Sequence, residues 1–302
     1  MTPVVRHNVQ TDDDLALAAD YYPGDDDSPV VLLLHGGGQS RHAWSTSAAR
    51  LNARGYTVVA YDARGHGDSD WDPAGQYDID RLVVDMVTVR DHFSRDTPPA
   101  VVGASLGGMT ILGAHLRNSA ALWGAIVLVD ITPRFEIQGA RRVAAFMAAH
   151  PDGFATLDEA AVVIAAYNPH RERTKSVDGL RKVLRQRQDG RWVWRWDPAF
   201  IHSNFKFLHG EPTTDSEQFD AISEQLVDGA RHISAPTLLV RGLLSDVVSL
   251  ETMEEFKQLV PHAETVDVHD AGHMIAGDDN NSFTTAAIDF LDRCDLWPSD
   301  SR

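Results

Sequence analysis

The sequence predicts an α/β fold built on a mostly parallel central sheet flanked by helices, and two observations lead to that prediction. First, short apolar runs without polar alternation recur along the chain, as in strands that are buried on both faces of a sheet. Second, segments with helical apolar spacing separate these runs over the first 130 residues and again from Pro236 onward. Regular alternation of strands and helices is typical of a parallel sheet covered on both sides.

The first elements of the chain are predicted strands. Residues 1–22 read as two short strands around an acidic turn, and a second acidic turn precedes the apolar run at residues 30–34. That run is too short for a helix and predicts a buried strand. It ends in His35-Gly36-Gly37-Gly38, where glycines allow backbone N–H groups to point into a cavity. No Gly-Lys-Ser/Thr follows, which argues against a phosphate-binding loop.

The alternation continues between this glycine loop and the next buried strand. A helix, a strand, a turn-rich loop and a second helix are expected at residues 42–54, 56–61, 62–69 and 79–93. The loop, Asp62-Ala63-Arg64-Gly65-His66-Gly67-Asp68-Ser69, contains two residue types that bind metals. We interpret His66 and Asp68 as partners in loop hydrogen bonds, with metal ligation as the alternative.

A Gly-x-Ser-x-Gly pentapeptide, Gly103-Ala104-Ser105-Leu106-Gly107, follows the apolar run at residues 100–102 and precedes a helix-like segment at residues 109–116. In a strand-to-helix turn, glycines leave room for close backbone approach, and the serine is held with its hydroxyl exposed. The N-terminal N–H groups of the helix are then available to stabilise an oxyanion. The alternative is a glycine-rich turn with an incidental serine.

The alternation stops after the strand predicted at residues 125–129, which ends at Asp130. Residues 131–232 are mostly helical in pattern, with no buried strand among them, and from Pro236 the alternation resumes. We therefore predict a core of residues 1–130 and 233–302 with an inserted helical lid, or cap, of residues 131–232. The expected lid helices are 138–150, 157–167, 176–187 and 216–228, and the later core elements are strands 237–240 and 265–268 and helices 250–259 and 282–291.

Two residues that could activate Ser105 follow the resumed strands. Asp246 comes after strand 237–240, and His273 comes after strand 265–268. Loops at the carboxyl ends of parallel strands converge at one edge of the sheet, so these three side chains can meet. Asp130 is an alternative carboxylate because it ends the strand at residues 125–129. Asp270 lies too close to His273 in sequence, and a loop-capping role suits it better.

These motifs resemble the α/β-hydrolase family, in particular its lidded esterases, lactonases and carbon–carbon hydrolases with a serine nucleophile. The matching pieces are the glycine loop after residue 34, the loop at residues 62–69, the serine pentapeptide, Gly242-x-x-x-Asp246 and Gly272-His273. The order Ser…Asp…His agrees with that fold. The resemblance implies Ser105 as nucleophile, His273 as general base and then acid, and Asp246 as the orienting carboxylate.

The resemblance also implies an oxyanion hole made by the backbone N–H groups of Leu106 and Gly37. Met109 and Met274, each near a catalytic candidate, either line the pocket or belong to the core. The tryptophans of the lid alternate in sequence and share one face if this piece is extended. We interpret them as lid packing, with substrate contact as the alternative; they are Trp192, Trp194 and Trp196.

The lid also contains a basic segment in an otherwise acidic chain. Between Arg171 and Arg195 there are nine Lys and Arg residues against three acids. One reading is that an arginine such as Arg181 or Arg185 binds a substrate carboxylate, because a guanidinium pairs with it through two hydrogen bonds. The other reading, which we favour, is a solvated helix face.

Together these features predict a cofactor-independent serine hydrolase that cleaves a small to medium, largely apolar carboxylic ester or lactone through an acyl-enzyme intermediate. A carbon–carbon hydrolase acting on a diketone from aromatic degradation would use the same triad. A ligand sensor with slow turnover is the third hypothesis, and perhydrolysis is a conceivable side reaction. The histidines show no paired ligand spacing, so no metal is expected.

Composition limits the partners. The net charge of −17 argues against nucleic acid and anionic membranes, so the expected partner is a small-molecule substrate. The single cysteine, Cys294, excludes an internal disulfide and is expected to be a buried structural thiol. No signal peptide or membrane-spanning run is evident, and we expect a cytoplasmic protein. The choice between monomer and homodimer stays open.

Overall fold

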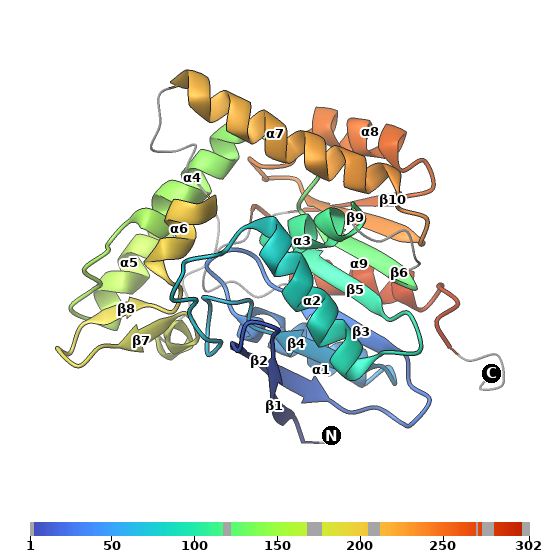
Figure 1. Cartoon of the computed structure of the whole chain (residues 1–302), viewed down its shortest axis with the longest axis horizontal. Helices are drawn as coiled ribbons and strands as arrows, with labels where there is room; N and C mark the ends of the chain where they lie inside the picture. The colour runs from blue at the N-terminus through green and yellow to red at the C-terminus, as the bar shows by residue number, and fades with distance from the viewer. Residues whose placement is uncertain are drawn as a thin grey trace.

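The computed structural model describes residues 3–116, 122–167, 177–204, 212–269, 271–273 and 281–297. In these ranges a central eight-stranded sheet is covered by helices on both faces, and a separate two-stranded hairpin lies beside it (Figure 1). The strand order is β1-β2-β4-β3-β5-β6-β9-β10. In this order, β1 pairs with β2 and β2 pairs with β4 in antiparallel fashion. Every later pair of neighbours in the central sheet, from β4–β3 to β9–β10, is parallel. The predicted mostly parallel α/β architecture is confirmed.

The bounds of the elements follow the predicted alternation. The strands of the central sheet are β1 Val5–Gln10, β2 Ala16–Tyr22, β3 Val30–Leu34, β4 Thr57–Tyr61, β5 Ala100–Ala104, β6 Ala125–Val129, β9 Thr237–Gly242 and β10 Glu264–Val268. The helices are α1 Ser45–Asn52, α2 Ile79–Phe93, α3 Leu106–Ala114, α4 Ile137–Ala148, α5 Leu157–Tyr167, α6 Pro198–Asn204, α7 Pro212–Arg231, α8 Leu250–Leu259 and α9 Asn281–Leu291. The hairpin strands are β7 Leu184–Gln186 and β8 Trp192–Trp194.

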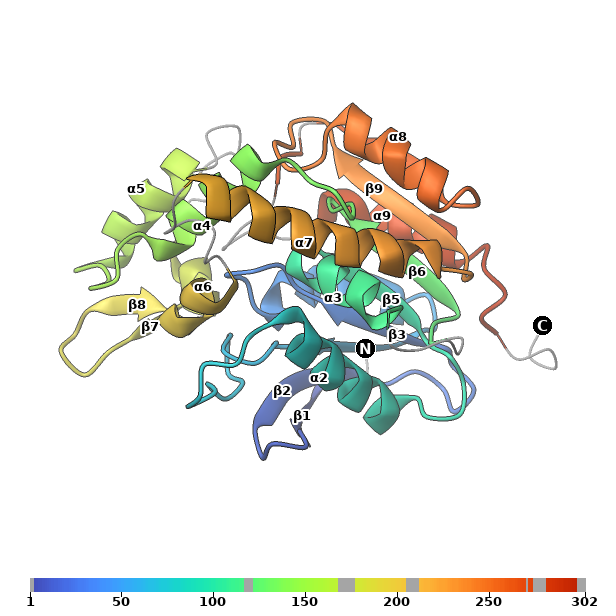
Figure 2. The same cartoon turned by 45° about the horizontal axis from the view of Figure 1, so that its top comes forward.

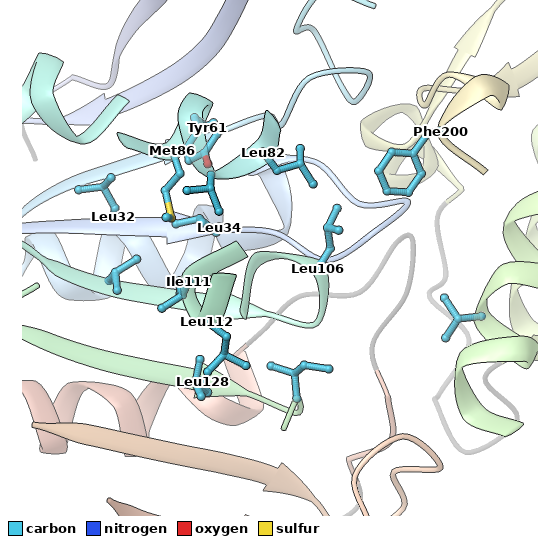
Figure 3. Packing of buried hydrophobic residues seen from close by; sticks show 14 of the residues in the cluster. Leu32, Leu34, Tyr61, Leu82, Met86, Leu106, Ile111, Leu112, Leu128 and Phe200 are labelled. Carbon is cyan, nitrogen blue, oxygen red and sulfur yellow. The ribbon is translucent and has the colours of Figure 1, made fainter. Parts of the chain in front are cut away.

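Side chains of β3 show how the sheet is covered on both faces. Successive residues of a strand point to opposite sides, so Leu32 and Leu34 join one apolar cluster with residues of α2 and α3. Val31 and Leu33 join a second cluster with residues of α1 and α9. Figure 3 shows the first cluster, in which Leu106 lies at the turn between strand and helix and Phe200 approaches from α6. Burial on both faces explains why these strands lack polar alternation.

The segment between β6 and β9 departs from the prediction at two places, one of which is helix α6, Pro198–Asn204, which was not expected. Residues 176–187 were expected to form a helix, but the described residues form a short 3-10 helix, Asp178–Lys182, followed by β7, which pairs with β8. The expected helix and the expected absence of strands in this segment are both wrong. Pairing across the hairpin, with Leu184 opposite Trp194, buries apolar side chains that a helix would leave apart. Gly190, with φ of 85°, lies in the connecting turn.

The inserted elements occupy two different positions. The hairpin β7–β8 and helices α4, α5 and α6 lie together at one end of the molecule (Figure 1). Helix α7 instead lies along α3 and beside α8 (Figure 2). A Cβ atom on Gly229 of α7 would lie 2.1 Å from the Leu112 carbonyl oxygen, so the two helices are in close backbone contact. Among the helices of the described ranges, none has both the length and the apolar character needed to cross a membrane.

Candidate active site

Ser105 occupies the turn between β5 and α3. The strand ends at Ala104 and the helix begins at Leu106, so Ser105 makes the whole turn, with φ of 46° and ψ of −111°. A positive φ is costly for a residue with a side chain. Close packing holds it there, because a Cβ atom on Gly107 would lie 2.6 Å from the Cβ atom of Leu34. The predicted strand-to-helix turn is confirmed.

His273 lies against Ser105, as the sequence predicts. Its Nε2 atom is 3.1 Å from Ser105 Oγ. Its Nδ1 atom is 2.8 Å from Oδ2 of Asp130, and both side chains are almost fully buried. If the imidazole is neutral, an Nδ1–H that donates to Asp130 leaves Nε2 free to accept the proton of the serine hydroxyl. The three side chains therefore form one hydrogen-bonded chain.

Asp130 is held for this contact by the loop that follows β9. Its Oδ1 atom accepts the Gly242 N–H at 3.0 Å, and its Oδ2 atom accepts the Ser245 hydroxyl at 2.7 Å. Its own N–H donates to the Val240 carbonyl oxygen at 2.8 Å, with φ of 51°. Because β6 lies between β5 and β9, Asp130 at its end is next to both the serine turn and this loop.

The expectation that Asp246 orients the histidine is wrong. Its carboxylate lies 2.7 Å from the Arg142 guanidinium of α4, at a partly exposed position. The preceding residue, Ser245, turns its hydroxyl inward to Asp130, so the next side chain points outward toward the insertion. The alternative considered from the sequence, Asp130, makes the contact instead. Asp130 directly follows β6, the strand adjacent to that of Ser105, whereas Asp246 lies four residues beyond the end of β9 in the loop before α8.

The glycine loop after β3 closes one side of the site. The Gly36 N–H donates to Gln39 Oε1 at 3.0 Å, and the Gly38 N–H donates to His66 Nε2 at 3.2 Å. Between them, the N–H of Gly37 has no acceptor in the part of the chain that the structure describes, and the same holds for the N–H of Leu106. Both residues line the cavity beside Ser105. The N–H groups of Gly37 and Leu106 are the hydrogen-bond donors that were predicted to stabilise the oxyanion.

Two buried histidines support the glycine loop. His35 Nδ1 lies 2.8 Å from the Gly36 carbonyl oxygen, and its Nε2 accepts the Ala63 N–H. His66 Nδ1 lies 3.1 Å from the Arg64 carbonyl oxygen, which leaves its Nε2 to accept from Gly38. Burial lowers the pKa of both imidazoles, and that of His66 falls to about 3, with the adjacent His35 adding to the effect. Both rings are therefore neutral and hold the loop through hydrogen bonds.

The loop interpretation of His66 and Asp68 agrees with the structure. Asp68 forms ion pairs with the guanidinium groups of three arginines, Arg6, Arg41 and Arg195. In the described ranges, no group of three or more His, Cys, Asp or Glu side chains is arranged to hold a metal ion.

A cavity of about 70 Å³ opens beside Ser105 and His273. Apart from these two side chains, every residue lining it is a glycine or apolar. Met109 is among them, which agrees with the pocket-lining alternative. The insertion contributes Ile131, Phe135, Ala140, Val143, Phe200, Phe219 and Ile222, and the remaining lining residues are Gly37, Ile79, Leu106 and Val247. The cavity therefore favours an apolar group next to the serine hydroxyl.

The tryptophans of the hairpin do not line this cavity. Trp192 packs under the Arg181 guanidinium at 4.6 Å, and Trp194 stacks on Trp196 with 4.4 Å between ring centroids. Trp194 also donates its Nε1–H to the Ala149 carbonyl oxygen. Trp192 and Trp194 are buried and absent from the lining of the cavity at Ser105, which agrees with the packing interpretation. Met274 lies outside the described residues, as do Asp270, Arg171, Arg173 and Lys175.

The sheet order, the serine turn and the histidine that faces it together define an α/β hydrolase. The family model for the α/β hydrolase fold matches residues 29–279, and the chain belongs to that family. The predicted resemblance is confirmed.

Two relatives and one solved structure to which the chain is similar are hydrolases. The chain is 30% identical over 260 residues to esterase Rv0045c of Mycobacterium tuberculosis, covering 83% of this chain and 78% of that protein. It is 25% identical over 299 residues to the sn-1-specific diacylglycerol lipase ABHD11 of Danio rerio, covering 94% and 85%. The crystal structure of an α/β hydrolase from Novosphingobium aromaticivorans superimposes with a TM-score of 0.78 at 24% identity, covering 97% and 99%. The chain is thus a hydrolase on the α/β fold.

Proposed function

We propose that the protein is a serine hydrolase that cleaves carboxylic esters, or lactones, with a small to medium apolar acyl group. The observation that carries this proposal is the hydrogen-bonded chain from Ser105 through His273 to Asp130 at the edge of an apolar cavity. A serine hydroxyl is a weak nucleophile at neutral pH and needs a base to accept its proton and a carboxylate to orient that base.

The arrangement supports a two-step reaction. Ser105 Oγ attacks the substrate carbonyl carbon while His273 Nε2 accepts the hydroxyl proton. His273 then donates that proton to the departing alcohol oxygen as the ester bond breaks, which leaves an acyl-serine. In the second step His273 takes a proton from water, the resulting hydroxide attacks the acyl carbon, and Ser105 recovers its proton as the acid leaves.

The negative charge on the carbonyl oxygen needs donors that are already in place. The N–H groups of Gly37 and Leu106 border the cavity at Ser105, and the structure shows no other acceptor for them in the described ranges. Leu106 is also the first residue of α3, so the helix dipole adds positive potential at that point. Donors of this kind contribute about 10²–10³-fold each to the rate.

The substrate class follows from the cavity. Its lining presents no charged side chain toward the space beside Ser105, and burying a charged acyl group there would cost several kcal/mol without a partner. Residues of the segment 131–232 form part of the wall, including Phe219 and Ile222 of α7, and we assign that segment the role of a cap. The esterase and lipase names of the relatives agree with an acyl ester as substrate.

The first experiment is labelling with a fluorophosphonate, read by intact mass, on the wild type and on Ser105→Ala. One adduct is expected on the wild type and none on the variant. Labelling that persists in the variant would locate the nucleophile elsewhere. A panel of p-nitrophenyl esters and aliphatic lactones then ranks the substrates.

The same panel separates the rival functions that use this triad. A vinylogous diketone that is cleaved faster than any ester would favour carbon–carbon hydrolysis. One equivalent of nitrophenolate followed by no further release would favour a slow-turnover ligand sensor. Steady turnover of the esters, with first-order dependence on enzyme concentration, is the result that we expect.

A further inference from the structure

A second cavity lies at the C-terminal end of α4. It measures about 460 Å³ and is enclosed by the end of α4, the β7–β8 hairpin, the start of α6 and Trp71 of the core. It shares no lining residue with the cavity at Ser105. Its lining residues are Trp71, Met147, Ala148, Ala149, Pro151, Arg185, Arg187, Val193, Trp194, Trp196, Pro198 and Ile201. We call it the hairpin cavity.

The hairpin cavity has the properties of a small-molecule site. Its volume falls within the usual range for such sites, about 300–1,000 Å³. Most of its wall is apolar, and Trp194 and Trp196 stack on each other as a rigid aromatic surface. Aromatic side chains of this kind provide a large contact area with little loss of conformational entropy.

Arg185 is a charged residue that lines this cavity. The Arg185 guanidinium lies 4.5 Å from the centre of the Trp71 ring, and no carboxylate within the described residues pairs with it. The neighbouring Arg187 is bound to Asp189. Stacking on an aromatic ring fixes the plane of a guanidinium while leaving its N–H donors available. Such a group can pair with a carboxylate.

We propose that the hairpin cavity binds an amphipathic carboxylate, with the carboxylate paired to Arg185 and the apolar body against Trp194 and Trp196. A carboxylate matches the planar guanidinium through two parallel hydrogen bonds. The site is distinct from the catalytic cavity, and its occupancy does not depend on the hydrolase reaction.

The cavity also borders the glycine loop. A Cβ atom on Gly38 would lie 3.3 Å from Trp196 Cζ3 and 3.4 Å from Met147 Cε, and one on Gly37 would lie 3.5 Å from Met147 Sδ. Met147 and Trp196 line the hairpin cavity as well. Met147 and Trp196 thus form the wall between the ligand in the hairpin cavity and the glycine loop beside Ser105.

The test is calorimetric titration of the full chain with decanoate, decanol and decyltrimethylammonium. Decanoate is expected to bind at least about 10-fold more tightly than either of the others, as charge-assisted pairing with a guanidinium implies. Arg185→Gln should weaken the binding of decanoate by about 10-fold and leave the binding of decanol unchanged. Arg231→Gln, which removes one exposed charge at the end of α7, is the matched control and should bind as the wild type does.

Two variants locate the site. Ala148→Phe places a ring in the hairpin cavity and should abolish decanoate binding. Met109→Phe fills the catalytic cavity and should leave decanoate binding unchanged. Loss of binding in Met109→Phe but not in Ala148→Phe would put the ligand in the catalytic cavity and overturn the proposal. Equal affinity for decanoate and decanol, an unchanged Arg185→Gln variant, or no heat of binding at millimolar ligand would each overturn it as well.

Discussion

Asp130 Oδ2 lies 2.8 Å from Nδ1 of His273, and this contact joins the end of one strand to a loop 143 positions later in the chain. The same oxygen accepts the Ser245 hydroxyl, and the other carboxylate oxygen accepts the Gly242 N–H. A carboxylate with this many donors is fixed in direction. It can therefore fix the orientation of the imidazole ring that faces Ser105.

We expect Asp130→Asn to lower kcat for a p-nitrophenyl ester by about 10⁴-fold, because the amide favours the wrong imidazole tautomer. Asp246→Asn is the matched control, since it makes the same chemical change at the carboxylate that pairs with Arg142. The Asp246 carboxylate pairs with Arg142, whereas His273 is held by Asp130. The kcat of this variant should therefore stay within about threefold of the wild type, and because exposed ion pairs contribute little to stability, the variant should also remain folded. A larger loss of kcat in Asp246→Asn than in Asp130→Asn would show that Asp246, and not Asp130, orients His273.

Backbone strain at Ser105 predicts an effect on stability. Its φ of 46° costs a residue with a side chain about 1–3 kcal/mol, and glycine avoids most of that cost. Ser105→Gly should therefore have a free energy of unfolding about 1 kcal/mol above that of Ser105→Ala, measured by urea denaturation.

Ala104→Gly is the control for this comparison. Residue 104 lies in β5, where glycine should instead lower the free energy of unfolding by about 0.5–1 kcal/mol. A Ser105→Gly variant less stable than Ser105→Ala would show that the turn carries no strain.

Close packing beneath the serine turn makes Gly107 sensitive to any side chain. A Cβ atom there would lie 2.6 Å from the Cβ atom and the carbonyl oxygen of Leu34. Gly107→Ala should lower the free energy of unfolding by about 3 kcal/mol or prevent folding. Gly179→Ala has nothing within 4 Å of the added atom and should be neutral. Equal urea midpoints for the two variants would contradict the predicted clash.

The buried histidines of the glycine loop predict a dependence of stability on pH. Burial lowers the pKa of His66 to about 3 from its ordinary value of 6.5. Below pH 6.5 the unfolded chain binds a proton that the folded chain does not, so the stability present above that pH is progressively lost between pH 6.5 and about 3. His66→Gln, which retains an acceptor for the Gly38 N–H, should reduce this slope by up to about 1.4 kcal/mol per pH unit.

The measurement is urea denaturation at a series of pH values from 7.5 to about 4.5. His262→Gln, an exchange at an exposed position, is the control and should retain the wild-type slope. Some slope should remain in His66→Gln, because burial also lowers the pKa of His35 and lowers that of His115 to about 4. An unchanged slope in His66→Gln would show that His66 does not stay neutral in the folded chain.

The apolar cavity predicts how acyl length is selected. Met109→Phe should lower kcat/KM for hexanoyl and longer p-nitrophenyl esters by about 10-fold or more, because the added ring occupies space that the acyl chain needs. The acetyl ester should keep a rate within about threefold of the wild type. Leu116→Phe, at the exposed C-terminal side of α3, is the control. A uniform loss at every acyl length would place the acyl group elsewhere.

Much of the fold could be predicted because local patterns specify it. The apolar runs at residues 30–34 and 100–102 lie in strands, and the helices predicted at residues 79–93 and 250–259 have those bounds in the structure. These segments show an unambiguous period and sharp ends. The segment 176–187 is not the predicted helix, because residues 184–186 pair with Trp192–Trp194 in a hairpin. Pairing with a partner strand overrides local propensity.

By itself the sequence determined the alternating α/β pattern and the serine turn, since neighbouring residues encode each of them. It also identified His273 as the partner of Ser105, because both follow strands of one parallel sheet. Only the tertiary structure decided which carboxylate meets His273 and which side chains line the cavity. Asp130 and Asp246 both follow strands, and the choice between them depends on the direction in which one loop turns at Ser245. Such directions arise from packing between segments far apart in the chain, which no local pattern records.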